Sequence, residues 1–180
     1  MARKFTIMAV QNDELGTLRS LAEDTFIDTF AEANSPENIA AYTSKTFSLE
    51  QVSNEFHLRD SHFFFARLDG EIAGYLKLNT RLAQTEQGLE NAMEVERIYA
   101  KRAFQGKGIG KALMQKSIKV ANNKNVDWLW LGVWEKNTRA IEFYQRQGFQ
   151  IFGQHGFFMG NELQHDILMK LTIKNNSTKH

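Results

Sequence analysis

The sequence contains no cysteine, which excludes disulfides, thiol nucleophiles and zinc sites built on cysteine. A chain without cysteine also suits a reducing compartment, so we expect a cytoplasmic protein. The five histidines stand at positions 57, 62, 155, 165 and 180. Because none of them has His-x-x-x-His spacing, we expect no metal site and interpret them as surface or packing residues.

Long apolar runs and an excess of charge are also missing. No segment approaches the roughly 18 apolar residues that span a membrane, and no signal-peptide core follows the basic N-terminus. The formal net charge is only +1, whereas nucleic-acid binding normally requires a basic excess. We therefore expect neither a membrane nor a nucleic acid as partner.

The chain does contain enough apolar residues for one core. Its 180 residues are 42% hydrophobic and 24% charged, which predicts a single domain over residues 1–174. The polar end, residues 175–180, is expected to be a disordered tail. Nothing in the sequence decides the oligomeric state, so a homodimer stays open.

Apolar periodicity and turn residues predict an alternation of strands and helices. A strand over residues 5–10 precedes three helices, over about 13–33, from Pro36, and over about 49–59. Asp24, Asp28 and Glu32 lie four residues apart, so they form an acidic stripe along the first helix. Further strands are expected over 62–68 and 71–78, from Glu94, and over 127–134, 149–158 and 163–171, with a loop over 81–91, a helix after residue 110 and another from Asn137 to Gln147.

A glycine-rich turn over residues 105–110, Gln-Gly-Lys-Gly-Ile-Gly, connects a strand to a helix. Free N–H groups and the dipole at a helix start favour an anion, and glycine lets phosphate oxygens approach the backbone. The spacing fits neither a Walker loop nor a dinucleotide fingerprint, and a turn of this composition can also be turn chemistry alone. Four cations gather at the same helix end, where a bound polyanion would explain them: Lys101, Arg102, Lys107 and Lys111.

The pattern Gln105-x-x-Gly108-x-Gly110 resembles the pyrophosphate loop of the GNAT family of N-acetyltransferases at every fixed position. The order of strands and helices also resembles the GNAT fold across nearly the whole chain. This fold is of the α/β (α+β) class, with a central mixed, mostly antiparallel sheet flanked by helices. Within the family, four segments resemble polyamine acetyltransferases of the PaiA type, namely residues 24–30, 34–42, 94–99 and 134–149.

The resemblance implies acetyl-CoA as co-substrate and direct transfer of its acetyl group to a primary amine. It also implies that the loop binds the pyrophosphate, that strand backbone pairs with the pantetheine, and that an asparagine hydrogen-bonds the cofactor arm. The residues so assigned to the cofactor are Ile98, Tyr99, Ala100, Gln105, Gly106, Lys107, Gly108, Ile109, Gly110, Lys111 and Asn137.

Tyr144 is, by the same resemblance, the proton donor to the departing thiolate. Seven residues in a helix turn Asn137 and Tyr144 to within about 20° of each other, so both side chains face the same way. A phenol with a pKa near 10 stays protonated at neutral pH, while a CoA thiolate, similar to cysteine at about 8.5, needs a proton. The alternative is that Tyr144 is a core aromatic beside Phe143.

Carboxylates near the expected acceptor site suggest how the amine is deprotonated. Glu94 and Glu96 alternate along a strand and so share one face. Either could accept the proton of the amine through water, with Glu96 favoured because it lies nearer the residues that pair with the cofactor. Such a pair can equally be a solvated face or part of an ion pair.

Four acids on or just after the first helix suggest what the amine is. Carboxylates around one cleft attract a flexible polycation, even though the whole chain is almost neutral. We therefore predict a polyamine substrate such as spermidine or spermine. The same acids can also merely solubilise a helix face; they are Asp24, Asp28, Glu32 and Glu37.

The sequence thus predicts an enzyme that acetylates a small-molecule amine from acetyl-CoA. Two alternatives stay open: acetylation of a peptide N-terminus or lysine, and a CoA-binding regulatory protein with little turnover. Tyr144 favours turnover, because binding alone does not need a proton donor.

Overall fold

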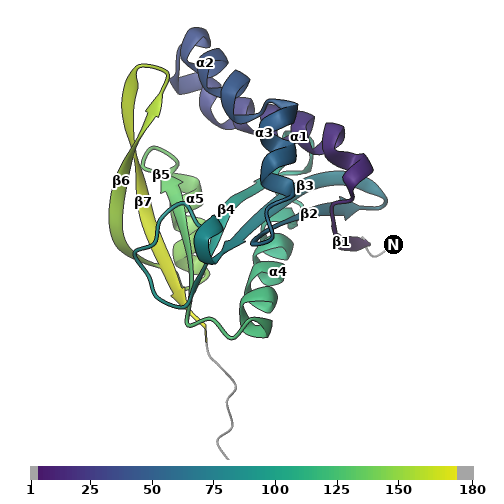
Figure 1. Cartoon of the computed structure of the whole chain (residues 1–180), viewed down its shortest axis with the longest axis vertical. Helices are drawn as coiled ribbons and strands as arrows, with labels where there is room; N and C mark the ends of the chain where they lie inside the picture. Colours follow the sequence, from purple (N-terminus) through teal and green to yellow (C-terminus); the bar gives the residue numbers. More distant parts are fainter. Residues whose placement is uncertain (1–3, 174–180) are drawn as a thin grey trace, which may run out of the picture.

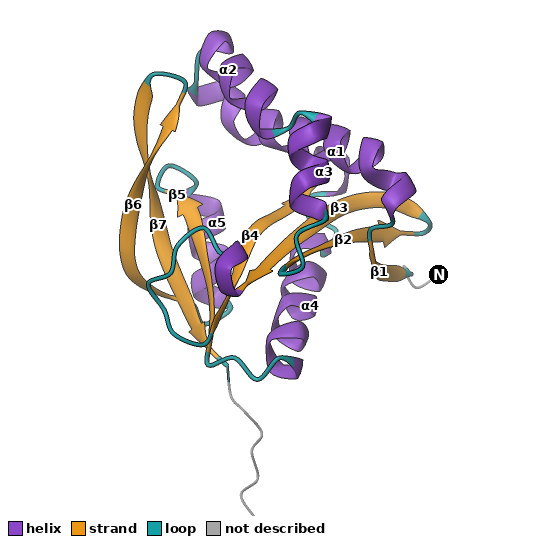
Figure 2. Ribbon diagram, in the orientation of Figure 1, coloured by secondary structure: helices purple, strands orange, loops and turns teal. Residues whose placement is uncertain are grey.

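A single sheet lies at the centre of the computed structural model, which describes residues 4–173. The tail predicted over 175–180 lies outside these residues. The seven strands follow the order β1-β2-β3-β4-β5-β7-β6, and every neighbouring pair is antiparallel except β4 and β5, which are parallel. Helices α1, α2 and α3 cover one face and α4 and α5 the other (Figures 1 and 2). The predicted mixed, mostly antiparallel sheet flanked by helices is confirmed.

The bounds of the elements follow the predicted order. The strands are β1 (Phe5–Ala9), β2 (Ser61–Leu68), β3 (Glu71–Thr80), β4 (Ala92–Ala100), β5 (Trp128–Trp134), β6 (Gln150–Met159) and β7 (Glu162–Thr172). The helices are α1 (Leu15–Phe30), α2 (Pro36–Thr46), α3 (Leu49–Phe56), α4 (Ile109–Asn123) and α5 (Thr138–Arg146). Short 3₁₀ turns are η1 (Asn12–Glu14), η2 (Ala31–Ala33), η3 (Arg81–Ala83) and η4 (Arg102–Phe104).

Side-chain caps fix where several helices begin. Ser35, Ser48 and Asn137 each accept a hydrogen bond from a backbone N–H in the first turn of α2, α3 and α5, which satisfies a donor that the helix itself cannot. The first helix is shorter than the predicted range 13–33, because the residues after Phe30 are exposed and leave the α-helix for a 3₁₀ turn.

Two apolar clusters, one on each face of the sheet, make up the core. Helices α1 to α3 pack on one face through Leu18, Phe26 and Val52, together with Tyr75 of β3. On the other face, Leu113 of α4 and Tyr144 of α5 belong to one cluster with Leu131 and Val133 of β5. Side chains of β5 alternate between the clusters, since its neighbouring Trp134 belongs to the first one.

The sheet separates between β4 and β5. Their pairing covers only Ala92–Glu94 opposite Trp128–Trp130. Lys77 pairs with Arg97 and Leu78 with Val95, so one extra residue of β4, Glu96, forms a bulge against β3. A bulge bends its strand, and beyond it β4 and β5 diverge (Figure 1). The edge of β4 that faces β5 is therefore left without a strand partner.

Candidate active site

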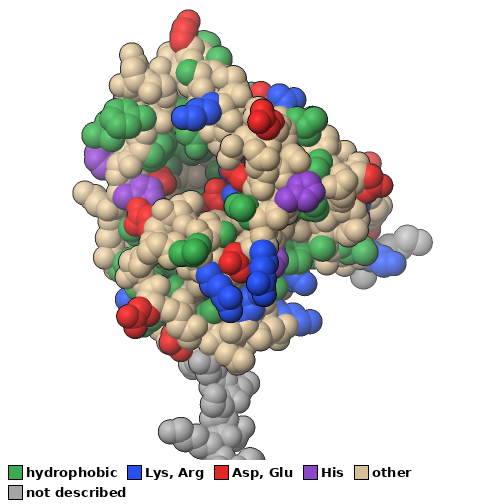
Figure 3. Space-filling view, viewed as in Figure 1, with side chains coloured by type: hydrophobic (Ala, Val, Ile, Leu, Met, Phe, Trp, Pro, Cys, Tyr) green, Lys and Arg blue, Asp and Glu red, His purple; other side chains and the backbone are tan. Residues whose placement is uncertain are grey.

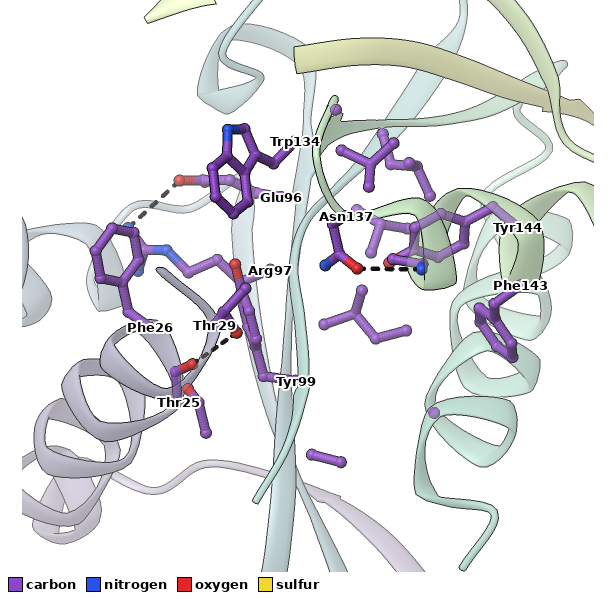
Figure 4. Close-up of a pocket in the computed structure, with 18 of the residues that line it drawn as sticks. Thr25, Phe26, Thr29, Glu96, Arg97, Tyr99, Trp134, Asn137, Phe143 and Tyr144 are labelled. Atoms are coloured by element: carbon purple, nitrogen blue, oxygen red, sulfur yellow. Dashed lines mark hydrogen bonds and ion pairs between the residues drawn. The ribbon is translucent and has the colours of Figure 1, made fainter. Parts of the chain in front are cut away.

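A cavity of about 650 Å³ occupies the opening between β4 and β5. The face drawn in Figure 3 is hollowed beside the helices, and acidic side chains are visible inside the hollow. The glycine-rich turn lies at one end of the cavity, and residues of α1, α2 and the β6–β7 hairpin line the other. In Figure 4, Phe26 and Thr29 of α1 lie across β4 from Tyr144 and Phe143 of α5.

The glycine-rich turn forms the N-terminus of α4. Gly106 and Gly108 have φ of +74° and +90°, values that glycine adopts without the strain of a side chain. Gly108 is the residue before the first turn of α4, and no side chain caps this helix end. The first backbone N–H groups of α4 are therefore free to bind an anion.

The residues assigned to the cofactor come together as predicted, with one exception. Lys107 does not line the cavity; it is exposed, and its Nζ lies 5.0 Å from the centre of the Phe104 ring. The sequence did not identify two further cations at this wall, Arg139 and Arg146 of α5. The predicted residues that do line the cavity are Ile98, Tyr99, Ala100, Gln105, Gly106, Gly108, Ile109, Gly110, Lys111 and Asn137.

Asn137 and Tyr144 line the same cavity, as their spacing predicted (Figure 4). The Asn137 Oδ1 accepts the N–H of Ala140 at 3.2 Å, so its amide NH₂ remains to donate to a ligand. Tyr144 is 8% exposed and packs against Phe143 and Phe149. Burial raises its pKa well above the ordinary value, which keeps the phenol protonated at neutral pH. Tyr144 is thus a core aromatic that also lines the cavity wall.

Glu96 lines the cavity but belongs to a buried ionic network. Its carboxylate pairs with Lys77 and lies 3.4 Å from an Arg97 nitrogen, and it accepts a hydrogen bond from Asn79. Glu55 of α3 completes the network, 2.9 Å from Lys77 and 3.0 Å from Arg97. The two positive charges and two negative charges of this network cancel. Glu96 is therefore less available to accept a proton than its position on β4 suggested.

We expect Glu55→Gln to lower the free energy of unfolding by roughly 3 kcal/mol, because it leaves one buried cation of this network without a counter-charge. Burial acts to raise the pKa of Glu55, but Arg97 and Lys77 together hold it below the ordinary value. The stability that Glu55 contributes is therefore present above its unfolded pKa and is lost as the pH falls through the lowered folded pKa. Denaturant unfolding from pH 7 to pH 3 measures this, and an equal pH dependence in parent and variant would contradict it.

Glu94 is 3% exposed and is held from several sides. Its two carboxylate oxygens accept the hydroxyl of Thr85 at 2.6 Å, the N–H of Thr85 at 2.8 Å and the amide of Asn79 at 3.2 Å. Burial raises the pKa of Glu94, while these hydrogen bonds act in the opposite direction. Glu94 and Glu96 share Asn79, which shows that both do point to one face of β4.

The acids of the first helix are placed differently from the prediction. All four acids are exposed, but only Asp28 lines the cavity; Asp24, Glu32 and Glu37 are not among its lining residues. Asp24 lies one turn from Asp28 on α1. The chain leaves the α-helix before Glu32, which ends the acidic stripe.

Two cavity residues of the β6–β7 hairpin were not identified from the sequence. Asp166 of β7 and His155 of β6 both line the cavity, with the His155 Nε2 3.4 Å from an Asp166 carboxylate oxygen. His155, interpreted from the sequence as a surface or packing residue, thus also lines the cavity. An isolated acid in the otherwise apolar end of β7 was the available signal, but only the pairing of β6 with β7 reveals its partner.

No group of three or more metal-binding side chains occurs in residues 4–173. None of the helices in this range is long and apolar enough to cross a membrane.

Residues 19–149 match the model of the acetyltransferase (GNAT) family. An uncharacterized N-acetyltransferase from Lactobacillus delbrueckii subsp. lactis is 39% identical over 171 residues, which cover 93% of this chain and 96% of the relative. A spermidine N(1)-acetyltransferase from Thermoplasma acidophilum is 27% identical over 143 residues, which cover 77% of this chain and 84% of that protein.

A solved structure shares the arrangement of strands and helices. The crystal structure of PaiA N-acetyltransferase from Thermoplasma acidophilum in complex with coenzyme A matches with a TM-score of 0.75 and 24% identity, over 94% of this chain and 99% of that one. At this level of identity the likeness shows the fold, and it confirms the fold that the sequence predicted.

Proposed function

The chain belongs to the acetyltransferase (GNAT) family and is an acetyl-CoA-dependent N-acetyltransferase, and on that premise we propose that its acceptor is a primary amine of a polyamine such as spermidine or spermine. One observation carries the proposal. The acceptor end of the cavity has two carboxylates, Asp28 and Asp166, with which no lysine or arginine among residues 4–173 forms an ion pair. Because no lysine or arginine of this range neutralises them, these carboxylates can attract the ammonium groups of a substrate.

The walls between the carboxylates suit the rest of such a substrate. Phe26, Tyr42 and Trp134 line this part of the cavity, and the rings of Phe26 and Tyr42 stack with their centres 4.6 Å apart. Aromatic faces accept both the methylene segments of a polyamine and, through cation–π attraction, its ammonium groups. The spermidine acetyltransferase named among the relatives points in the same direction.

The other end of the cavity fits acetyl-CoA. The uncapped N-terminus of α4 and its glycines offer backbone N–H groups to a pyrophosphate. Lys111, Arg139 and Arg146 add positive charge at the same wall. The unpaired edge of β4 at Ile98–Ala100 is available to pair with an extended pantetheine arm. The related structure that contains coenzyme A supports this assignment.

In the reaction the acceptor nitrogen attacks the thioester carbon, a C–N bond forms, and the C–S bond breaks. Tyr144 lies on the α5 side of the sheet, where it donates its proton to the sulfur that departs. Asn137 orients the cofactor arm with its free amide NH₂. The nitrogen must be neutral when it attacks, so a carboxylate on the acceptor side must first remove a proton from the ammonium group.

A thiol-release assay over a panel of amines tests the proposal, and the absence of cysteine keeps its background low. We expect spermine and spermidine to be better substrates than simple monoamines. Because charge attraction is screened over about 8 Å at physiological ionic strength, KM for spermine should rise with salt more than KM for a monoamine.

Asp28→Asn should raise KM for spermine several-fold and leave the affinity for acetyl-CoA unchanged. Asp24→Asn is the matched control, because Asp24 lies one turn away on α1 and outside the cavity. If both variants behave like the parent, or if monoamines serve as well as polyamines, the polyamine assignment fails. Peptide N-termini and lysine peptides in the same panel would then identify the alternative substrates.

A further inference from the structure

We propose that Asp166 is the general base of the reaction and that His155 and Glu86 carry the accepted proton from Asp166 to the solvent. This inference deepens the proposed function, because it needs an amine that arrives as an ammonium ion. It rests on a chain of contacts that crosses three segments of the protein: β7, β6 and the segment between β3 and β4.

Asp166 lies on the acceptor face, beside the opening of the sheet. It pairs with Trp134 in the β5–β7 register, and directly opposed residues of two strands share one face. Its carboxylate also lies across Gly132, where an added Cβ would come within 3.3 Å of an Asp166 oxygen. Gly132, Trp134 and Asp166 all line the cavity, so the carboxylate is exposed to a bound acceptor.

A series of close side-chain contacts leads from this carboxylate toward the surface. The His155 Nε2 is 3.4 Å from an Asp166 oxygen, and the His155 Nδ1 is in contact with a carboxylate oxygen of Glu86. The Glu86 side chain is 39% exposed. The His155 imidazole thus lies between the half-buried Asp166 carboxylate and the more exposed Glu86 carboxylate, with one ring nitrogen toward each, and an imidazole can accept a proton at one nitrogen and release one from the other.

The segment that carries Glu86 is fastened to the cavity wall. The Trp130 indole donates to Gln84 at 2.7 Å, and Thr85 donates twice to Glu94. Gln84, Thr85 and Glu86 therefore contact β5, β4 and β6 in turn. These contacts fix Glu86 against His155.

The base and the acid lie on opposite faces of the sheet. Tyr144 packs with Leu131 and Val133 of β5, whereas Asp166 lies beside Trp134, which points to the other face. The two faces communicate through the opening between β4 and β5, where both residues line the same cavity. The amine can therefore lose a proton on one side while the thiolate gains one on the other.

The proton balance closes without another reactant. The Asp166 carboxylate takes one proton from R–NH₃⁺ and passes it through His155 and Glu86 to the solvent. The neutral R–NH₂ then forms the C–N bond, its second surplus proton reaches the sulfur through Tyr144 as the C–S bond breaks, and Tyr144 ends in its original state. The products are R–NH–acetyl, CoA–SH and one released proton.

Asp166 is better suited to this role than the two glutamates of β4. Glu96 is neutralised by Lys77 and Arg97, and both oxygens of Glu94 accept hydrogen bonds. Burial raises the pKa of Asp166, and His155 acts in the opposite direction. Glu86, Glu135 and Tyr42 are the other titratable groups near this carboxylate, so a pH profile reports on the cluster.

The test compares a strongly basic alkylamine with an amine of low basicity, such as a fluorinated ethylamine, that is already neutral at pH 7. An alkylamine with a pKa near that of lysine is neutral only to about one part in 10³ at pH 7. Asp166→Asn should lower kcat at a saturating concentration of the alkylamine by on the order of tenfold to 10²-fold. A rise in KM alone would show that Asp166 only attracts the ammonium group and would overturn the proposal. The variant should leave kcat for the low-basicity amine nearly unchanged, and the loss for the alkylamine should become smaller as the pH rises.

His155→Gln should give a smaller loss with the same selectivity for the basic amine. His165→Gln is the matched control, because His165 lies beside Asp166 in β7 and pairs with Glu135 at 3.7 Å but does not line the cavity. Equal losses for both amines would show that Asp166 has a structural role. An unchanged activity of Asp166→Asn would indicate that a glutamate of β4 is the base, and either result overturns the proposal. Failure of the proposed function is distinct, because it appears in the parent enzyme as poor use of polyamines.

Discussion

Gly108→Val is expected to abolish the binding of acetyl-CoA, with a loss of at least 10²-fold in affinity. Gly108 has a φ of +90° directly before α4, so a β-branched side chain there is strained and projects where the phosphates must approach the backbone. Isothermal titration calorimetry measures the affinity. The thermal stabilisation by acetyl-CoA, about 2.7 kcal/mol at a ligand concentration of 100 Kd, should disappear as well.

Gly70→Val is the matched control for this change. Gly70 has a φ of +91° in the turn between β2 and β3, and no atom lies within 4 Å of an added Cβ. Both variants should therefore lose about 1–3 kcal/mol of stability through backbone strain, but only Gly108→Val should lose acetyl-CoA. If Gly108→Val binds as tightly as Gly70→Val, the turn is not the pyrophosphate site.

Most of the fold could be predicted because its signals are local. The apolar run before Trp134, the Asp69-Gly70 turn and the Ser48 cap each act within a few residues, and each element formed where it was expected. The end of α1 was overestimated, since it depends on what the helix packs against after Phe30. The separation of β4 from β5 follows from a bulge at Glu96, which no pattern in the sequence indicates.

The two ends of the site differ in how far they could be predicted. The cofactor end is built from contiguous residues around Gly108 and from the helix after Asn137, so spacing alone brings them together. The acceptor end combines Asp28 with Asp166, which are far apart in the chain and meet only through the packing of α1 and β7 around the cavity. The sequence therefore predicted too many acids on the first helix and none on the last hairpin.

Tyr144→Phe should lower kcat by on the order of 10²-fold while the affinity for acetyl-CoA stays nearly the same. The change removes only the hydroxyl, so the packing of the ring against Phe143 and Phe149 is kept. Since the phenol acts on the sulfur only as the C–S bond breaks, its loss should affect the transition state and not the ground state. Steady-state kinetics with a saturating amine, combined with calorimetric titration of acetyl-CoA, separates these quantities.

Phe143→Leu at the neighbouring position controls for packing, because Phe143 also lines the cavity but carries no proton. It should change stability more than kcat. The pH profile adds a second criterion: burial raises the pKa of Tyr144, so the phenol stays protonated through the alkaline range. The defect of Tyr144→Phe should therefore be the same for basic and low-basicity amines and at every pH from 7 to 9, unlike a defect in the base. An unchanged kcat for all amines would leave Tyr144 as a core aromatic and remove the proton donor from the mechanism.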